Sequence, residues 1–275
     1  MRELGGKVAV VTGGGSGIGR GMVLAFAQAG MHVAIADVEI ASAEKVADEA
    51  RAFGVKALAV ATDVARRDSV EALAERVFGD LGAAHVLCNN AGVAVFGQLA
   101  EMSDDDWRWL LSVNLEGVVN GLQAFLPRMQ AQPGEKHVVN TASVAGIAAM
   151  PGIGIYTATK YAVVGISETL RQEGAAWGLG VSVLCPGAVN TRIMESERNR
   201  PAALGESKPV AFPLGGDANT IAAGLDPLAV GRRVRSAVQN DELYVFTHPG
   251  TRTLFERRAA ALRAGFDAAE SWRDE

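Results

Sequence analysis

The sequence has very little cysteine, and it has fewer basic than acidic residues. Its two cysteines, Cys88 and Cys185, occur among 275 residues, and each lies in an apolar, strand-like run. We therefore expect two buried, reduced thiols in a cytoplasmic protein rather than a disulfide framework. Lysine and arginine total 26 against 31 aspartates and glutamates, a net charge of −5, and no basic run occurs. This charge argues against a nucleic-acid partner.

Long, wholly apolar runs are also missing. The segment before Lys7 is short and polar, unlike a signal peptide. A long uncharged stretch, Val138–Thr159, contains polar residues, a proline and several glycines, which are not favoured at bilayer depth. We therefore expect no membrane partner. The four histidines are scattered, and His85 with Cys88 lacks a second ligand pair, so no metal site is expected.

The pattern of hydrophobic residues predicts the fold class. Of all residues, 49% are hydrophobic, which suffices for a full core, and single α/β domains often reach this length. We expect one domain over residues 1–275. Short β-branched runs alternate with helical patterns, and each parallel strand pair needs a crossover of this length. The pattern therefore predicts a doubly wound, Rossmann-like parallel α/β sheet of about seven strands with helices on both faces. The predicted strands are Val8–Val11, His32–Ala36, Lys56–Ala61, His85–Leu87, His137–Thr141, Val181–Cys185 and Leu243–Phe246.

The first strand leads through a glycine-rich turn into a helix. Glycines there let the backbone approach a pyrophosphate, whose charge the first helical N–H groups favour. The spacing Gly13-xxx-Gly17-x-Gly19 is neither the GxGxxG fingerprint nor a P-loop, and a tight turn with nothing bound is the alternative. Asp37 ends the second strand about 20 residues further on, where dinucleotide folds place the ribose-binding carboxylate. Dinucleotide binding is therefore the favoured interpretation.

Ligands in such sheets bind beyond the carboxyl ends of the strands. This rule gathers one set of residues at one edge: Gly13–Gly19, Asp37, Asp63, Asn90, Ser143 and Pro186–Thr191. Residues 192–225 show no clean period and are expected to form a flexible substrate segment over that edge. Residues 247–275 are expected to form a helical extension, in which Phe255, Ala259, Leu262 and Phe266 share one face. That stripe packs either on its own domain or on a neighbouring subunit.

Tyr156 and Lys160 are four residues apart, so on a helix they share a face. The alternative is an ordinary helix start with a core tyrosine and a surface lysine. At a separation of about 4–5 Å and an effective dielectric near 20, the Lys160 ammonium would stabilise the Tyr156 phenolate by about 3–4 kcal/mol. This attraction would lower the pKa of the phenol by about 2–3. Such a tyrosine suits general acid–base catalysis. Ser143 would then donate to the substrate oxygen, or it satisfies a local backbone group.

In this order, the motifs resemble those of the short-chain dehydrogenase/reductase family, in its compact single-domain branch. The matching residues are Thr12-Gly13-xxx-Gly17-x-Gly19, Asp63-Val64, Asn89-Asn90-Ala91-Gly92, Asn114, Ser143, Tyr156-xxx-Lys160 and Pro186-Gly187 with Thr191. The resemblance covers Leu4–Thr191 firmly and Pro227–Phe246 by pattern.

The resemblance implies a hydride-transferring enzyme with Asn114, Ser143, Tyr156 and Lys160 as its catalytic residues. Asn114 would hold a water in a proton relay, and Lys160 would also bind the nicotinamide ribose. The implied cofactor-binding residues are Gly13, Ser16, Gly17, Ile18, Gly19, Asp37, Asp63, Val64, Asn90, Ala91, Gly92, Tyr156, Lys160, Pro186, Gly187, Val189 and Thr191. Relatives are usually tetramers, which implies a homo-oligomer, a tetramer or dimer, formed through the helices at about Ser103–Met129 and Tyr156–Trp177.

The cofactor and the substrate class are predicted from side chains. Asp37 is followed by Val38 and Glu39 rather than an arginine, and its carboxylate would repel a 2′-phosphate, so NAD is predicted. The small-molecule substrate is predicted to be a hydrophobic secondary alcohol or its ketone, because the expected pocket residues are mostly apolar. They are Val95, Phe96, Val144, Met150, Ile193 and Met194, with Ser143 and Tyr156. A 3-oxoacyl-thioester reductase and a non-catalytic dinucleotide-sensing regulatory protein remain the alternatives.

Overall fold

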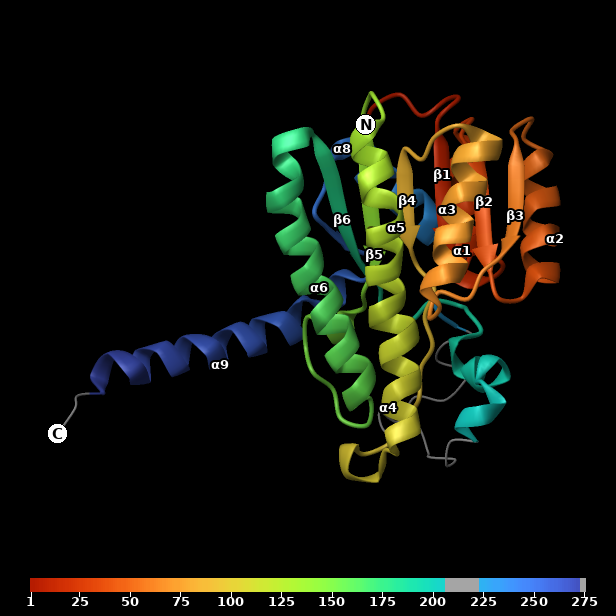
Figure 1. Ribbon diagram of the computed structural model, residues 1–275. Coiled ribbons are helices and arrows are strands. Elements are labelled where there is room, and N and C mark those ends of the chain that lie inside the picture. Colours follow the sequence, from red (N-terminus) through yellow and green to blue (C-terminus); the bar gives the residue numbers. More distant parts are fainter. Residues whose placement is uncertain (206–222, 273–275) are drawn as a thin grey trace.

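In the computed structural model, which describes residues 1–205 and 223–272, seven strands form one parallel sheet in the order β3-β2-β1-β4-β5-β6-β7 (Figure 1). The strands are β1 (Val8–Thr12), β2 (His32–Asp37), β3 (Ala57–Ala61), β4 (Val86–Asn89), β5 (Lys136–Thr141), β6 (Leu179–Cys185) and β7 (Tyr244–Phe246). Every neighbouring pair is parallel. The predicted doubly wound α/β sheet is therefore confirmed.

Helices cover both faces of the sheet (Figure 1). On one face pack α1 (Gly17–Gln28), α2 (Ile40–Arg51) and α8 (Pro227–Asn240). On the other pack α3 (Arg67–Leu81), α5 (Gly117–Ala131) and α6 (Gly154–Gly174). Short turns of 3-10 helix connect these elements: η1 (Leu99–Glu101), η3 (Val144–Gly146) and η4 (Ala175–Trp177).

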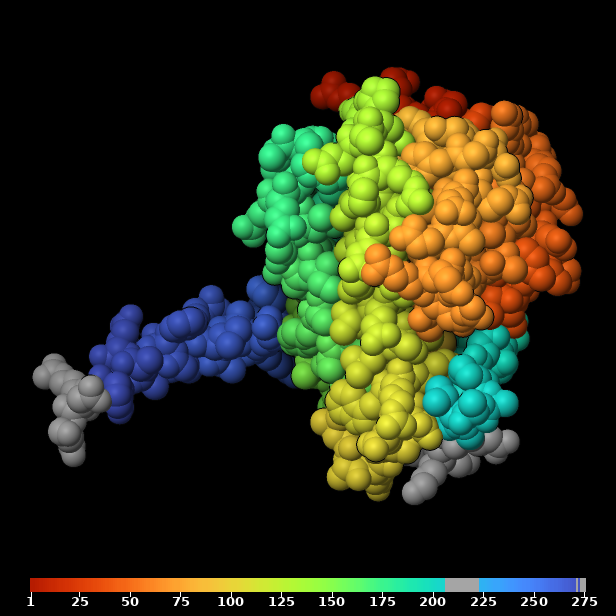
Figure 2. Space-filling model, viewed as in Figure 1, coloured from red at the N-terminus to blue at the C-terminus, as the bar shows by residue number. Residues whose placement is uncertain are grey.

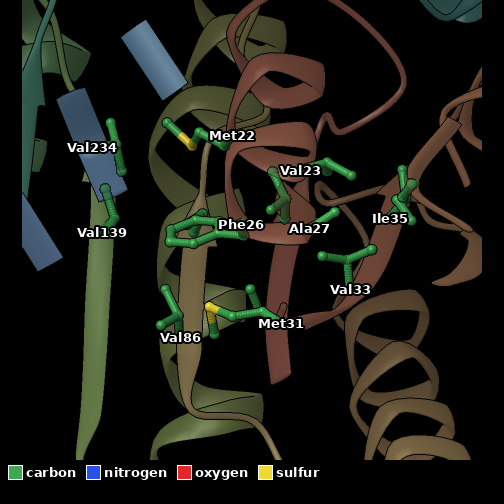
Figure 3. Packing of buried hydrophobic residues seen from close by; sticks show 14 of the residues in the cluster. Met22, Val23, Phe26, Ala27, Met31, Val33, Ile35, Val86, Val139 and Val234 are labelled. Carbon is green, nitrogen blue, oxygen red and sulfur yellow. The ribbon is translucent and has the colours of Figure 1, made fainter. Parts of the chain in front are cut away.

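The strands are apolar on both sides because each side faces a different helical layer. In β1, Ala9 and Val11 belong to one buried cluster while Val8 and Val10 belong to the other, as the two-residue period of a strand requires. Figure 3 shows the first cluster, where Phe26 of α1 packs beside Met22, Met31 and Val86. Burial of one such side chain contributes about 1.5–3 kcal/mol.

The predicted helix at Ser103–Met129 is divided in the structure. It consists of α4 (Asp104–Leu111), a π-helical turn η2 (Ser112–Glu116), and α5. The predicted capping box at its start is confirmed: the Asp106 N–H donates to Ser103 Oγ (3.2 Å), and the Ser103 N–H donates to Asp106 Oδ2 (3.0 Å). The π-turn contains Asn114, which is fully buried, and π-turns of this kind are frequent at functional sites.

Two segments lie outside the doubly wound core. Of the predicted substrate segment 192–225, residues 206–222 lie outside the described residues; before them, η5 (Ile193–Asn199) and η6 (Ala202–Leu204) lie below the sheet in Figure 1. After β7, η7 (Pro249–Thr251) leads into α9 (Arg252–Ser271). Figures 1 and 2 show α9 projecting away from the body of the molecule.

The first of the two expectations for the apolar stripe of α9, that it packs on its own domain, is wrong, because the large side chains of the stripe are exposed. Phe255 is 49% exposed, Leu262 50% and Phe266 72%. We call α9 the arm, and the sheet with its covering helices the body. A cation–π contact from Arg258 of the arm to the ring of Tyr161 in α6 joins the two. Among the described residues, no helix combines the length and apolar character needed to cross a membrane.

Candidate active site

A cavity of about 550 Å³ opens at the carboxyl ends of the strands. Nearly all of the residues predicted for the site line it. Those that line it are Gly13, Ser16, Gly17, Ile18, Gly19, Asp37, Asp63, Val64, Asn90, Ala91, Gly92, Phe96, Ser143, Val144, Met150, Tyr156, Lys160, Pro186, Gly187, Val189, Thr191, Ile193 and Met194. The carboxyl ends of the strands therefore bring Gly13 and Met194, 181 positions apart in the sequence, into one cavity.

Two predicted site residues lie behind the cavity wall. Val95 is buried in a cluster with Trp109, Leu110 and Ile155, so it supports the wall without facing the cavity. Asn114 is buried completely beneath it. Sequence reasoning missed several lining residues, namely Ala94, Trp109, Ser196, Asn199, Thr251 and Leu254. No periodicity or motif in their segments distinguishes them, because only tertiary packing brings them to the cavity.

The glycine-rich turn is shaped by close backbone approach. Gly13 and Gly17 have φ angles of +62° and +49°. A Cβ atom on Gly19 would lie 2.0 Å from the carbonyl oxygen of Gly13, so the turn closes only with glycine there. Ser16 is the N-cap of α1 and makes no side-chain capping bond, and the first turn of α1 has no acidic residue. The first N–H groups of the helix are therefore available to an anion, and they fit the pyrophosphate of a dinucleotide.

Asp37 lies at the end of β2, 8% exposed, within this cavity. Its Oδ2 accepts from the Gly15 N–H (2.8 Å) and its Oδ1 from the Glu39 N–H (2.9 Å). Burial raises the pKa of Asp37, and the two backbone hydrogen bonds oppose that rise. The carboxylate is thus held in one orientation at the edge of the sheet, as a ribose-binding group requires.

Two arginines lie near Glu39, two residues after Asp37, although no arginine follows Asp37 directly in the sequence. Arg192 and Arg198 line the same cavity. Arg198 Nε lies 3.3 Å from Glu39 Oε1, and Arg192 Nη1 lies 3.8 Å from Glu39 Oε2. Asp37 is followed in the sequence by Val38 and Glu39, as noted, but the fold brings these two guanidinium groups to Glu39. Glu39 partly neutralises both guanidinium groups.

A hydrogen-bond network ties three strand ends together at the cavity floor. Thr12 Oγ1 accepts from the N–H groups of Asn90 (2.9 Å) and Ala91 (3.1 Å). Asn90 Nδ2 donates to the Thr12 carbonyl (3.0 Å), and Thr141 Oγ1 donates to Asn90 Oδ1 (3.2 Å). The network fixes the backbone of Ala91 and Gly92, which both line the cavity.

Ser143, Tyr156 and Lys160 lie together in the cavity. Ser143 follows β5 as the N-cap of η3, and Tyr156 and Lys160 are one turn apart in α6. The Ser143 side chain lies close enough to the Tyr156 hydroxyl to lower the pKa of the phenol. Lys160 Nζ lies 5.3 Å from the centre of the Tyr156 ring and donates to the Thr141 carbonyl (2.9 Å). A proton donor, a hydrogen-bonding hydroxyl and a cation therefore face the same space.

Burial governs the pKa values of this pair. It raises the pKa of Tyr156, against the opposing effect of the Ser143 side chain, and it lowers the pKa of Lys160 to about 8. The predicted lowering of the tyrosine pKa is therefore wrong for the protein alone. That prediction counted the attraction between phenolate and ammonium but not their desolvation, which disfavours both charged forms.

Asn114 acts on the backbone beside this pair. From the π-turn, its Oδ1 accepts from the Val93 N–H (2.8 Å), and its Nδ2 donates to the Val93 carbonyl (2.9 Å) and to Thr159 Oγ1 (3.4 Å). The side chain thus joins the segment after β4 to α6, one residue from Lys160. Its role in a proton relay stays a prediction.

Similarity to known proteins agrees with this geometry. The sequence profile of the short chain dehydrogenase family matches residues 7–202. A C alpha-dehydrogenase from Sphingobium sp. strain SYK-6 is 33% identical over 95% of this chain and 87% of its own length. A short chain dehydrogenase/reductase from Burkholderia phymatum, crystallised in complex with NAD, is 39% identical over 96% of this chain and 97% of its own, with a TM-score of 0.92. The apo form of LigO from Sphingobium sp. strain SYK-6 is 34% identical over 98% of this chain and 93% of its own, with a TM-score of 0.82.

Proposed function

Because this chain belongs to the short chain dehydrogenase family and is an oxidoreductase of that family, we propose that it interconverts a hydrophobic secondary alcohol and its ketone with NAD as cofactor. One observation carries the proposal. Ser143, Tyr156 and Lys160 line the same cavity as the anion-binding glycine turn and Asp37. Interconversion of an alcohol and its ketone by hydride transfer needs a proton-transferring group beside a dinucleotide site, and the residues proposed for both roles line this one cavity.

The residues present fit NAD. The uncapped start of α1, at Ser16 and Gly17, would hold the pyrophosphate, and Asp37 would accept from the adenosine ribose. Asp63 and Val64 would contact the adenine. When bound, the nicotinamide would accept hydride from the alcohol carbon or return it to the ketone. The NAD found in the Burkholderia relative supports the same choice.

The chain's own groups would handle the proton. In alcohol oxidation the substrate O–H bond breaks and its proton passes to the phenolate oxygen of Tyr156 while the carbon loses hydride, which leaves a C=O bond. Ser143, whose side chain acts on the phenol of Tyr156, would donate to the substrate oxygen and hold it beside that phenol. The Lys160 ammonium would stabilise the phenolate. Ketone reduction reverses each step.

The cavity walls support a neutral, apolar substrate. The charged lining residues are Asp37, Asp63, Lys160, Arg192 and Arg198. Asp37 and Asp63 are the residues proposed for the adenosine of NAD, and Arg192 and Arg198 are paired with Glu39. The remaining wall is mainly apolar, and its large side chains are Phe96, Trp109, Met150, Ile193, Met194 and Leu254. No charged clamp for a substrate carboxylate or phosphate stands among these lining residues.

We also propose that the protein is a cytoplasmic homo-oligomer, a tetramer or dimer. The buried free thiols of Cys88 and Cys185 support a reducing compartment. The family resemblance supports association through α4–α5 and α6. The exposed apolar stripe of α9 favours a neighbouring subunit as its cover, because single-chain proteins rarely leave such a surface in water.

Replacement of Tyr156 by Phe tests the function. We expect kcat for NADH formation from cyclohexanol and other secondary alcohols to fall about 10²–10⁴-fold, with NADH affinity nearly unchanged, because only the proton-transferring hydroxyl is removed. The matched control is Tyr161→Phe in the same helix, whose hydroxyl donates to the Ile147 carbonyl. Undiminished turnover in Tyr156→Phe would refute the assignment of this residue. Wild-type protein that binds NADH but oxidises no alcohol would favour the regulatory alternative, and turnover of 3-oxoacyl thioesters alone would favour the reductase.

A further inference from the structure

The roof segment, residues 193–205, forms one wall of the cavity without belonging to any motif of the sequence. It contains η5 and η6, and its residues Ile193, Met194, Ser196 and Asn199 line the cavity. Its internal backbone hydrogen bonds, such as the one from the Leu204 N–H to the Pro201 carbonyl, each close one short turn and do not fix where the segment lies. Its position therefore depends on contacts with the rest of the chain.

Arg200 makes the main contact, and it is buried. Its side chain is 3% exposed and that of Asp106, at the start of α4, is 6% exposed. Arg200 Nη1 donates to Asp106 Oδ1 at 2.8 Å. The other oxygen of Asp106 accepts from the N–H and the hydroxyl of Ser103. The carboxylate that receives Arg200 is thus held by the capping box of α4.

The same guanidinium shapes the segment and touches the cavity wall. Arg200 Nε donates to the Gly205 carbonyl (2.6 Å) and Nη2 to the Leu204 carbonyl (3.3 Å), which closes the turn after η5. Its Cζ lies 5.1 Å from the ring centre of Trp109, a residue that lines the cavity. Leu204 and Tyr156 both pack against the buried cluster that contains Trp109.

A second contact holds the front of the roof segment. Ser196 Oγ accepts from the Ala94 N–H (3.0 Å) and donates to the Ile193 carbonyl (2.6 Å). The segment is therefore attached to α4 at one end and to the chain after β4 at the other. Both attachments lie on elements that also contribute cavity residues.

Stability alone does not explain the buried pair of Arg200 and Asp106. Replacing a buried ion pair by apolar side chains is often neutral or stabilising, because desolvation offsets the attraction. Arginine adds a planar guanidinium whose N–H donors point in fixed, fork-like directions. It therefore specifies the relative positions of the groups that accept from it. Here the fork aligns the roof segment, α4 and the Trp109 ring at once.

We infer that Arg200 is a positioning residue of the substrate site: through Asp106 and Trp109 it holds the roof segment in place, and it thereby favours alcohols large enough to contact that wall. The inference rests on the proposed function for its substrate class. A small alcohol held only by Ser143 and Tyr156 should be insensitive to the roof segment. A larger one gains its affinity from it.

Arg200→Met tests the inference with NAD⁺ and two alcohols, cyclohexanol and isopropanol. We expect kcat/KM for cyclohexanol to fall about tenfold or more, mainly through KM, since misplacement by about 1 Å can cost 10²-fold. In Arg200→Met, kcat/KM for isopropanol and the Kd of NADH should stay within about twofold of the wild-type values. Arg200→Lys keeps the positive charge but not the planar guanidinium, so it should recover part of the lost kcat/KM for cyclohexanol. Arg108→Met is the control, because Arg108 pairs with Asp105 on the exposed face of α4.

Hydrogen exchange supplies a readout that does not need turnover. In Arg200→Met, the amides of residues 193–205 and of Ala94 should exchange faster than in the wild type, and in Arg108→Met they should not. An equal loss for both alcohols, or unchanged exchange in the roof segment, would overturn the inference. If the wild type oxidises neither alcohol, the proposed function fails, and the exchange experiment still decides whether Arg200 holds the segment.

Discussion

At the scale of single residues, the site buries charges that water would otherwise stabilise. Lys160 is 3% exposed, and burial lowers its pKa to about 8, while burial raises the pKa of Tyr156. The two groups therefore stay neutral more readily than in water. A positively charged nicotinamide beside them would favour the phenolate, so cofactor binding and proton transfer are expected to be coupled.

Lys160→Met is expected to stabilise the protein near pH 7. Burial lowers the pKa of Lys160 from the usual 10.5 to about 8, which corresponds to about 3.5 kcal/mol at about 1.4 kcal/mol per pH unit. Loss of the hydrogen bond to the Thr141 carbonyl offsets about 1 kcal/mol of this gain. Between pH 8 and 10.5 the unfolded chain binds more protons at this site, so the wild type gains stability as pH rises and the advantage of the variant shrinks. Denaturant unfolding across this range measures the change. Exposed Lys45→Met is the control, and a destabilised Lys160→Met at every pH contradicts the argument.

The surroundings of Asp37 determine the expected cofactor preference. At a distance of about 4 Å and a dielectric of 40–80, repulsion between the Asp37 carboxylate and the 2′-phosphate of NADP⁺ would weaken binding by about 1–4 kcal/mol. Asp37→Ala combined with Glu39→Gln removes this repulsion and frees Arg198 from its ion pair. We expect the ratio of kcat/KM for NADP⁺ to that for NAD⁺ to rise about 10- to 10³-fold. Glu49→Gln, which breaks an exposed pair with Arg20, should leave the ratio unchanged; a constant ratio in the double variant would refute the assignment.

At the scale of elements, the glycine turn shows how a local sequence makes a binding site. Its glycines bring the backbone of β1 and the start of α1 so close that no side chain fits. That closeness leaves the helix N-terminus uncapped and open to a phosphate. The π-turn in the neighbouring layer involves a contact distant in the chain, because Asn114 in that turn binds the backbone of Val93.

Gly19→Ala is expected to impair dinucleotide binding. The new Cβ would meet the Gly13 carbonyl oxygen at 2.0 Å and Asn90 Nδ2 at 2.7 Å, so the turn must open. We expect the Kd of NADH to rise at least about tenfold and the free energy of unfolding to fall by about 1–3 kcal/mol. Fluorescence titration and thermal unfolding measure the two effects. The control is Gly79→Ala in α3, where a Cβ meets nothing within 4 Å and should stabilise the helix by about 0.5–1 kcal/mol.

At the scale of the whole molecule, the body and the arm differ in kind. The body buries each helix against the sheet, whereas α9 extends from it by 20 residues, about 30 Å at about 1.5 Å per residue. In proteins most of the stability of a helix comes from packing of its apolar face, which α9 lacks in the single chain. The arm begins at the cavity, since Thr251 and Leu254 line it. A subunit that covers the arm would therefore also steady this wall.

The triple variant Phe255→Ser, Leu262→Ser and Phe266→Ser tests the cover of the arm. We expect light scattering to give the wild type a mass that is a multiple of 28.7 kDa, and the variant a smaller multiple, because the apolar stripe is lost. Ala260→Ser with Ala264→Ser changes the other side of α9 and should leave the mass unchanged. Equal masses for the wild type and the triple variant would show that the stripe does not hold subunits together.

The sequence by itself determined the parallel α/β fold, the glycine turn, the capping box and the edge of the sheet at which the candidate site lies. These features depend on residues close together in the chain or on the alternation of strands and helices, and such patterns are visible without coordinates. Only the tertiary structure decided that Arg200 meets Asp106, 94 positions away, and that Arg198 meets Glu39, 159 positions away. It also decided the pKa values of Tyr156 and Lys160 and the departure of α9, because desolvation and packing depend on what surrounds a side chain in space.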